Sequence, residues 1–211
     1  MRIPSLIIIL FITLICNAQS TDFQWRYTTI PDSVWNRING VSYKKGCPVK
    51  RNDLRYMKVL HVTRNGSVRT GELICHESIA QDLLDIFKEL YKARYVIERV
   101  ELIDKYNASD ERSMEANNTS CFNYRTMTGS NKVSKHGYGM AIDINPLYNP
   151  YIKGNKVEPA SGRKYAFNRE KRNDIPMKID RNDLCYKLFI KHGFSWGGAW
   201  KSVKDYQHFE K

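Results

Sequence analysis

Two short stretches, far apart in the chain, constrain its fold most strongly, because their side chains make chemical sense only if they meet. The first is S-K-H-G-Y-G-M-A-I-D, from Ser134 to Asp143, and the second is D-Y-Q-H-F, from Asp205 to Phe209. Together they supply two imidazoles and two carboxylates. Open zinc sites in proteins take three ligands from His, Asp, Glu and Cys side chains and leave a fourth position free. The sequence therefore predicts a fold that brings both stretches to one divalent cation.

The spacing in the first stretch indicates how it reaches a metal. His136 and Asp143 are seven positions apart, which on a helix would put both on one face. However, Gly137 and Gly139 weaken a helix, and Ala-Ile-Asp is typical of a strand. In a straight strand an odd separation places two side chains on opposite faces. We therefore expect His136 on a glycine-bent turn and Asp143 on the strand that follows.

In the second stretch, a turn leading into a short strand would bring Asp205 and His208 towards the same ion. We assign His136, Asp143 and His208 as ligands of one zinc ion per chain, and Asp205, one shell further out, as a catalytic base. Isolated His-x6-Asp and Asp-x2-His pairs also arise by chance. Spacing alone therefore leaves a purely structural role open.

The order of the motifs carries a family resemblance. S-x-H-x-x-G-x-A-x-D is followed by W-G-G-x-W at 196–200 and D-x-x-H-F at 205–209. The likeness extends upstream through 110–125 and includes D-I-N-P and the N-P after it, at 143–150. These motifs resemble the D-alanyl-D-alanine carboxypeptidase (VanY-type) family of zinc peptidases, which includes the L-alanyl-D-glutamate endopeptidases of cell-wall lysis. The likeness covers roughly residues 45–211.

The resemblance implies an α+β fold, a small antiparallel sheet with flanking helices, as in hedgehog signalling domains and DD-peptidases. It implies hydrolysis of an amide bond in the peptidoglycan stem peptide. The stretch A-N-N-T-S-C-F-N, at 116–123, looks closer to the L-alanyl-D-glutamate endopeptidase branch. A D-alanyl-D-alanine carboxypeptidase and a non-catalytic, zinc-containing wall-binding module are the alternatives.

The resemblance also assigns roles to single residues. An arginine that matches Arg125 stabilises the oxyanion of amide hydrolysis in the family, while an ordinary salt bridge is the alternative for this side chain. Ser134 resembles a serine that touches substrate or orients the first ligand, and its alternative role is a turn cap. We also expect Tyr138 and Trp196 to bind substrate.

The first residues indicate export. Arg2 precedes an apolar run from Leu6 to Ile15 that is too short for a membrane span, and Cys16-Asn-Ala18 suits signal-peptidase cleavage after Ala18. A lipoprotein anchor at Cys16 is disfavoured by the bulky Ile15. We expect a signal peptide at 1–18, an N-terminal extension at 19–44 and a zinc peptidase domain at 45–211. The mature chain would be a periplasmic or secreted monomer with no membrane span.

The formal net charge of +12 favours anionic partners. Export argues against nucleic acid, so the anionic cell wall is the better match, with a merely solubilising surface as the alternative. After cleavage four cysteines remain, which permits three disulfide pairings. Free buried thiols are equally compatible with the sequence. The four are Cys47, Cys75, Cys121 and Cys185.

Periodicity predicts the main elements. Ile79, Leu83, Ile86, Phe87 and Leu90 recur at helical spacing in a helix over 77–91. Asn65-Gly66 is a strong hairpin turn. The remaining predictions are strands at 56–62, 68–75 and 95–103; helices at 31–39, capped by Asp32 or Ser33, and at 181–192, with Leu184, Leu188 and Phe189 inward and Gly193 as the stop; a polar loop or short turn at 104–120; and a surface excursion at 147–178 that walls a cleft.

Overall fold

The computed structural model describes residues 23–127 and 130–211, so the predicted signal peptide and Cys16 lie outside the described residues. The α-helices are α1 (Asp32–Ile38), α2 (Glu77–Lys92), α3 (Asp110–Glu115) and α4 (Leu184–Lys191). The strands are β1 (Tyr27–Thr29), β2 (Leu54–Val62), β3 (Val68–His76), β4 (Arg99–Val100), β5 (Asn118–Thr119), β6 (Ala141–Asp143), β7 (Tyr151–Lys153), β8 (Lys156–Glu158), β9 (Ser195–Trp196), β10 (Lys204–Asp205) and β11 (His208–Glu210). Short 3-10 helices, η1 (Arg51–Asp53), η2 (Ile103–Tyr106), η3 (Lys135–Tyr138), η4 (Ala160–Tyr165), η5 (Arg169–Lys171) and η6 (Gly197–Ala199), connect them. The predicted α+β class is confirmed.

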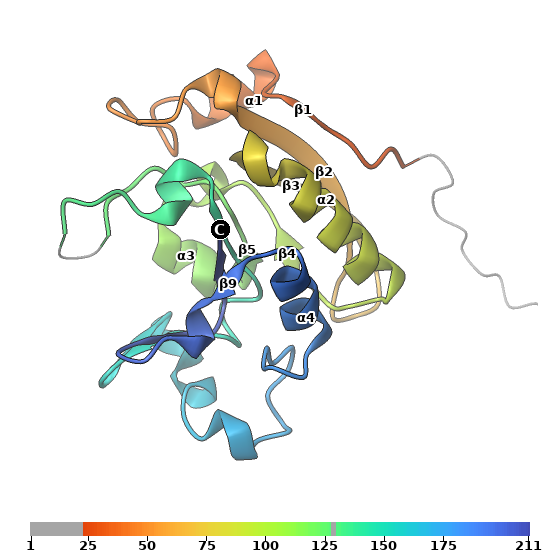
Figure 1. Ribbon diagram of the computed structural model, residues 1–211, viewed down its shortest axis with the longest axis vertical. Coiled ribbons are helices and arrows are strands. Elements are labelled where there is room, and N and C mark those ends of the chain that lie inside the picture. The colour runs from red at the N-terminus through yellow and green to blue at the C-terminus, as the bar shows by residue number, and fades with distance from the viewer. Residues whose placement is uncertain (1–22, 128–129) are drawn as a thin grey trace, which may run out of the picture.

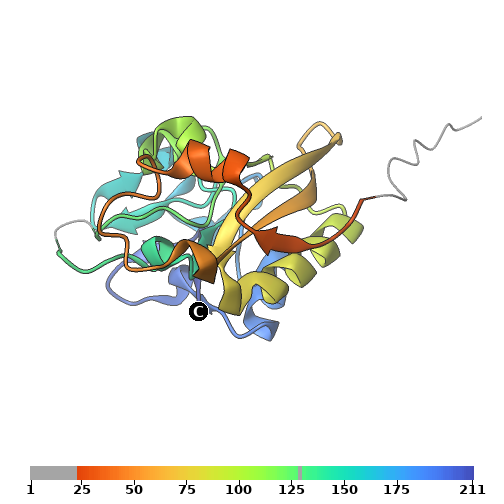
Figure 2. The same cartoon turned by 90° about the horizontal axis from the view of Figure 1, so that it is seen from above.

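A long antiparallel hairpin and the helix that follows it dominate one side of the molecule. β2 and β3 pair along their whole length around a turn in which Gly66 has a φ of +83°. α2 follows β3 directly and lies beside the hairpin (Figures 1 and 2). The His76 side chain caps this helix by accepting a hydrogen bond from the Ser78 backbone N–H at 3.2 Å. The hairpin and the helix predicted from the sequence are both confirmed.

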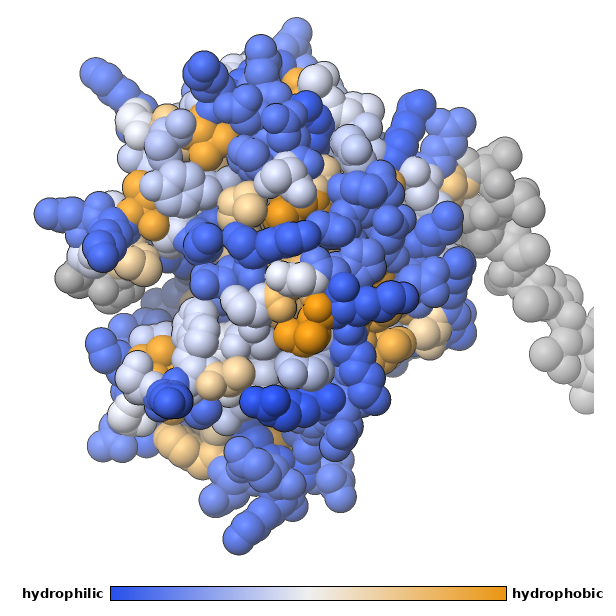
Figure 3. Space-filling model, viewed as in Figure 1, coloured by the Kyte–Doolittle hydropathy of each residue, from blue (hydrophilic) through white to orange (hydrophobic). Residues whose placement is uncertain are grey.

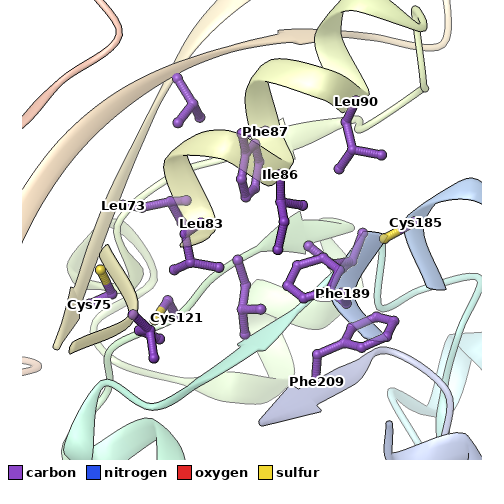
Figure 4. Close-up of a cluster of buried hydrophobic side chains, with 14 of the residues drawn as sticks. Leu73, Cys75, Leu83, Ile86, Phe87, Leu90, Cys121, Cys185, Phe189 and Phe209 are labelled. Atoms are coloured by element: carbon purple, nitrogen blue, oxygen red, sulfur yellow. The ribbon is translucent and has the colours of Figure 1, made fainter. Parts of the chain in front are cut away.

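The apolar stripe of α2 builds the main core. All five residues predicted from its periodicity are buried. They pack with Phe189 of α4 and Phe209 of β11, whose rings stack at 4.3 Å between centroids (Figure 4). Because the last strand of the chain is anchored in this core, the residues beside Phe209 are held in place. His208 and Glu210 are those residues.

The sequence predicted one small antiparallel sheet, but the strands of the described residues form three antiparallel sheets. These have the orders β1-β2-β3, β10-β7-β8 and β6-β11-β9, and a parallel pair, β4-β5, accompanies them. The second and third sheets are connected by the turn between β10 and β11. This turn carries the D-x-x-H motif, so both short sheets position it.

The strand predicted over 95–103 is much shorter: β4 (Arg99–Val100) pairs with β5, and before it Val96 forms an isolated bridge to Val62 of β2. Side-chain amides accept two of the other backbone hydrogen bonds. The Asn145 Oδ1 atom accepts from the Glu98 N–H at 3.1 Å, and the Asn118 Oδ1 atom accepts from the Glu101 N–H at 2.8 Å. These bonds satisfy the segment without extending a sheet.

Three predictions about helices are wrong in detail. Pro31 occupies the N-cap position of α1 without a side-chain hydrogen bond, so neither Asp32 nor Ser33 caps it. The polar stretch 104–120 contains the helix α3, which Ser109 caps. α4 begins after Asp183, and its first residue, Leu184, is exposed rather than inward. The predicted stop at Gly193 is confirmed by its φ of +81°.

The residues before β2 share a core with the rest of the chain. Ile30, Val34 and Ile38 are buried with Phe122 and with apolar side chains of the hairpin such as Leu54. The domain boundary predicted at residue 45 remains a prediction. The visible surface is mainly hydrophilic, with small scattered apolar areas (Figure 3). Among the described residues, no helix combines the length and the hydropathy needed to cross a membrane.

Candidate metal centre and cleft

The three predicted metal ligands converge. His136 lies on η3, and Asp143 and His208 lie opposite each other on the antiparallel strands β6 and β11. Directly opposed residues project their side chains from the same face of a sheet, which brings these two together. The closest approaches are 3.0 Å from His208 Nδ1 to Asp143 Oδ1, 3.3 Å from His136 Nε2 to Asp143 Oδ2, and 3.2 Å between the two imidazole nitrogens.

These distances suit an ion bound between the two imidazoles and the Asp143 carboxylate, with each imidazole facing a different carboxylate oxygen. Three ligand atoms, each about 2.0–2.1 Å from zinc, lie about 3.3 Å from one another in a tetrahedral site. The part of the chain that the structure describes contains no other cluster of three potential His, Cys, Asp or Glu ligands. The donor set of two imidazoles and one carboxylate therefore fits zinc in number, type and spacing. The same set also serves Fe(II) in some enzymes.

Hydrogen bonds behind the imidazoles set their tautomers. The Nδ1 atom of His136 lies 2.6 Å from the Cys121 carbonyl oxygen, and the Nε2 atom of His208 lies 3.0 Å from Glu210 Oε2. Both acceptors require a proton on the nitrogen that faces them. In the neutral rings the lone pairs are then on His136 Nε2 and His208 Nδ1, the two atoms that face Asp143. Three electron-pair donors pointing at one place require a positive charge between them.

The pKa shifts in the cluster also indicate that a positive charge is required there. Burial favours the neutral form of Asp143, but the charges and hydrogen bonds of His136 and His208 hold its pKa well below the usual range. Burial likewise opposes a charge on His208. Its hydrogen bonds to Asp143 and Glu210 nevertheless raise the pKa of His208 to about 10. Without a metal ion, a proton would supply the missing positive charge.

A glycine with a left-handed backbone places His136. Gly139 ends η3 with a φ of +69°, and its backbone packs so closely that a Cβ there would lie 2.7 Å from the His76 nitrogen. Ser134 caps the start of η3 by accepting a hydrogen bond from the Gly137 N–H at 3.2 Å. The predicted glycine-bent turn is therefore present.

Asp205 lies on β10, three residues before His208. Its Oδ1 atom is buried and has no hydrogen-bond partner among the described residues. Burial raises the pKa of Asp205 to about 7, the nearby His208 opposes that rise, and the charge of Asp143 adds to it. A carboxyl group with a pKa near neutrality is suited to accept and release a proton. This oxygen is an unused acceptor for a hydrogen bond from a substrate or water group.

The centre opens into a cleft of about 1150 Å³, which is lined by residues from several distant parts of the chain. The candidate ligands and Asp205 line it together with Glu111 and Gln207. One wall comes from the β7–β8 hairpin, because Tyr151 pairs with Asp205 across adjacent strands. The predicted excursion at 147–178 thus contributes a wall of the cleft.

The other predicted site residues have different environments. Arg125 lines the cleft, and its guanidinium forms an ion pair with Asp110, so the salt-bridge alternative is present. Ser134 and Tyr138 also line the cleft; Ser134 is buried, whereas Tyr138 is 39% exposed. Their contact with substrate remains a prediction, as does the role of Arg125 in binding an oxyanion.

Trp196 is not placed in the cleft, which corrects the prediction that it binds substrate. Its ring is buried in the main core, and its Nε1–H donates to the Tyr206 carbonyl oxygen at 3.0 Å. The tryptophan of this segment that lines the cleft is Trp200, whose ring centroid lies 5.4 Å from that of His208. Sequence reasoning also missed Glu210. Its position two residues after His208 on a strand was the available signal, because such residues share a face.

All four cysteines of the described chain are free thiols. Cys75, Cys121 and Cys185 are buried, and burial raises the pKa of each of these thiols. The structure thus agrees with the alternative of free thiols rather than disulfides. None of them belongs to the candidate metal centre.

Comparison with known proteins bears on the same region. Residues 128–211 match a family model described as D-alanyl-D-alanine carboxypeptidase. This confirms, for that part of the chain, the resemblance to the D-alanyl-D-alanine carboxypeptidase family. The matched region contains the three candidate ligands and Asp205, but Arg125 precedes it. No curated protein and no solved structure matches the chain.

Proposed function

We propose that this chain is an exported zinc peptidase that hydrolyses an amide bond in the stem peptide of peptidoglycan. One observation carries the proposal: His136 Nε2 and His208 Nδ1 lie 3.2 Å apart, and each lies within 3.3 Å of an Asp143 carboxylate oxygen in the lining of a cleft. The family match favours zinc over Fe(II) and a cell-wall peptide over other substrates. It also favours a location outside the cytoplasm.

Zinc held by these residues would lower the pKa of a water molecule towards ~7 and polarise the scissile carbonyl. The protein supplies the proton transfer. Asp205 takes a proton from the attacking water on its unpartnered Oδ1 atom and returns it to the leaving amine. Arg125 lines the same cleft, where its charge would stabilise the developing oxyanion. Its ion pair with Asp110 would fix the guanidinium in place.

The bond that we propose is L-alanyl-D-glutamate, on the likeness of the stretch at 116–123 to that branch of the family. The description of the matched family model favours D-alanyl-D-alanine carboxypeptidase as the second candidate. A non-catalytic wall-binding module is the third. The net charge of +12 suits an anionic wall under all three.

Mass spectrometry of purified peptidoglycan after digestion distinguishes these candidates. An endopeptidase exposes the amino group of D-glutamate, whereas a carboxypeptidase releases free D-alanine. Asp205→Asn keeps the size of the side chain but removes the base, and we expect it to lower the rate by about 10²–10⁴-fold. If wild type and variant release products equally, or if neither releases any, the peptidase proposal is wrong.

A further inference from the structure

Glu210 lies directly behind one of the candidate ligands. It follows His208 by two residues on β11, so both side chains leave the same face of the strand. The strand is held on both sides, because Glu210 pairs with Ala141 of β6 and Ser195 of β9. The carboxylate is therefore fixed beside the imidazole, with Oε2 at 3.0 Å from Nε2.

The hydrogen bond has a chemical consequence for the metal centre. A neutral imidazole carries one N–H, and the Glu210 carboxylate can only accept, so the proton of His208 is on Nε2. The lone pair is then on Nδ1, the atom that lies 3.0 Å from Asp143 Oδ1 and 3.2 Å from His136 Nε2. With the opposite tautomer, His208 would present an N–H to the cluster and could not bind a cation.

The two imidazoles differ in what holds them. His136 donates to the backbone carbonyl of Cys121, a neutral group that no side-chain substitution removes. His208 donates to a carboxylate, which strengthens the imidazole as an electron donor as well as orienting it. Glu210 contributes no atom to the cluster of potential ligands, so its effect passes through His208.

We propose that Glu210 is a positioning residue that holds His208 in the metal-binding tautomer and thereby raises the affinity of the centre for zinc. This inference rests on the proposed function for the identity of the metal. It assigns a role to a residue outside the D-x-x-H motif, and it predicts coordination of zinc through Nδ1 of His208 rather than Nε2.

Competition against a chromophoric zinc chelator tests the proposal without any peptidase assay. We expect Glu210→Ala to weaken zinc binding by about 10–100-fold. Glu210→Gln keeps an acceptor but loses the charge, so its loss of affinity should be smaller. Glu89→Gln is the matched control, because it removes an exposed, ion-paired carboxylate. Glu89 lies on α2, distant in sequence from the candidate ligands.

Two further readouts separate positioning from a structural effect. Cobalt substitution should give visible absorption bands that differ in Glu210→Ala, and the metal-free variants should unfold at the same temperature as wild type within a few degrees. If Glu210→Ala does not fold, Glu210→Gln and Glu210→Asp carry the test. Zinc affinity within twofold of wild type in every folded variant would overturn the proposal. Peptidoglycan hydrolysis with unchanged affinity would refute this inference alone, and tight, Glu210-dependent zinc binding without hydrolysis would refute the proposed function alone.

Discussion

Replacing Gly197 with alanine would displace the segment that carries the proposed base. A Cβ at this position would lie 2.7 Å from the Asp205 carbonyl oxygen, 2.8 Å from Asp205 Cβ and 3.3 Å from His208 Cβ. Non-bonded carbon atoms prefer separations of about 3.5–4.0 Å, so Asp205 would have to move by about 0.7 Å. None of these three atoms is the end of a flexible side chain. The backbone that carries Asp205 and His208 must therefore shift.

A misplacement of about 1 Å in a catalytic constellation costs about 10²-fold in rate. We therefore expect kcat/KM of Gly197→Ala for a soluble stem peptide to fall by about 10–100-fold, with a stability loss of about 1–3 kcal/mol from overpacking. Zinc affinity should fall less than activity, because the Cβ clashes mainly with Asp205. Chelator competition and product release measured on the same sample would separate the two effects.

Gly66→Ala provides the control. Gly66 has a φ of +83° in the β2–β3 turn, and a Cβ there meets no atom within 4 Å. The left-handed conformation would cost about 1–2 kcal/mol, similar to the expected loss in Gly197→Ala, but far from the cleft. If Gly197→Ala and Gly66→Ala lose activity equally, or if neither loses any, the reasoning about the packing of Asp205 is wrong.

Three further predictions concern the protein away from the metal. Burial raises the pKa of Asp183 to about 6, so the folded state binds its proton more tightly than the unfolded state, and stability should fall as the pH rises from about 4 to 6. Across this pH range, the free energy of unfolding in urea should fall by about 2–3 kcal/mol less for Asp183→Asn than for wild type. The same pH dependence in both proteins would contradict the assignment. Arg169→Met should destabilise the protein by about 2–4 kcal/mol in thermal unfolding, because it removes the hydrogen bonds of the guanidinium to the Tyr148 and Tyr165 carbonyl oxygens and to Asn149 Oδ1, and its contact 4.3 Å from the Tyr206 ring; a change under about 0.5 kcal/mol would refute this. Native alkylation and peptide mapping should label Cys47 and leave the three buried cysteines unmodified, and equal labelling of all four would disprove the packing described.

Local patterns in the sequence predicted the parts of the fold that local physics decides. The apolar stripe of α2 and the Asn65-Gly66 turn were correct because helical periodicity and turn chemistry act over a few residues. The prediction of a long strand at 95–103 was wrong because distant residues decide the structure of this segment. Two of its backbone N–H groups donate to the side chains of Asn145 and Asn118, which are distant in the chain and carry no signal at the strand itself.

In the candidate site, too, local motifs could be read from the sequence, whereas contacts between distant segments could not. The motif order located the three residues that meet, and the glycine pattern predicted the turn at His136. The sequence could not distinguish Trp196 from Trp200, because either tryptophan of W-G-G-x-W suits a core or a cleft. Only the pairing of β9 with β11 puts Trp196 inside the core. Likewise, the ion pair of Arg125 with Asp110 depends on where α3 lies.

We expect His136, Asp143 and His208 to share one zinc ion. Diffraction data collected on either side of the zinc absorption edge, from crystals of the zinc-loaded protein, test it most directly. We expect one anomalous peak per chain, about 2.0–2.1 Å from His136 Nε2, His208 Nδ1 and an Asp143 oxygen. A peak at any other place, or none at the junction of these three side chains, would contradict it.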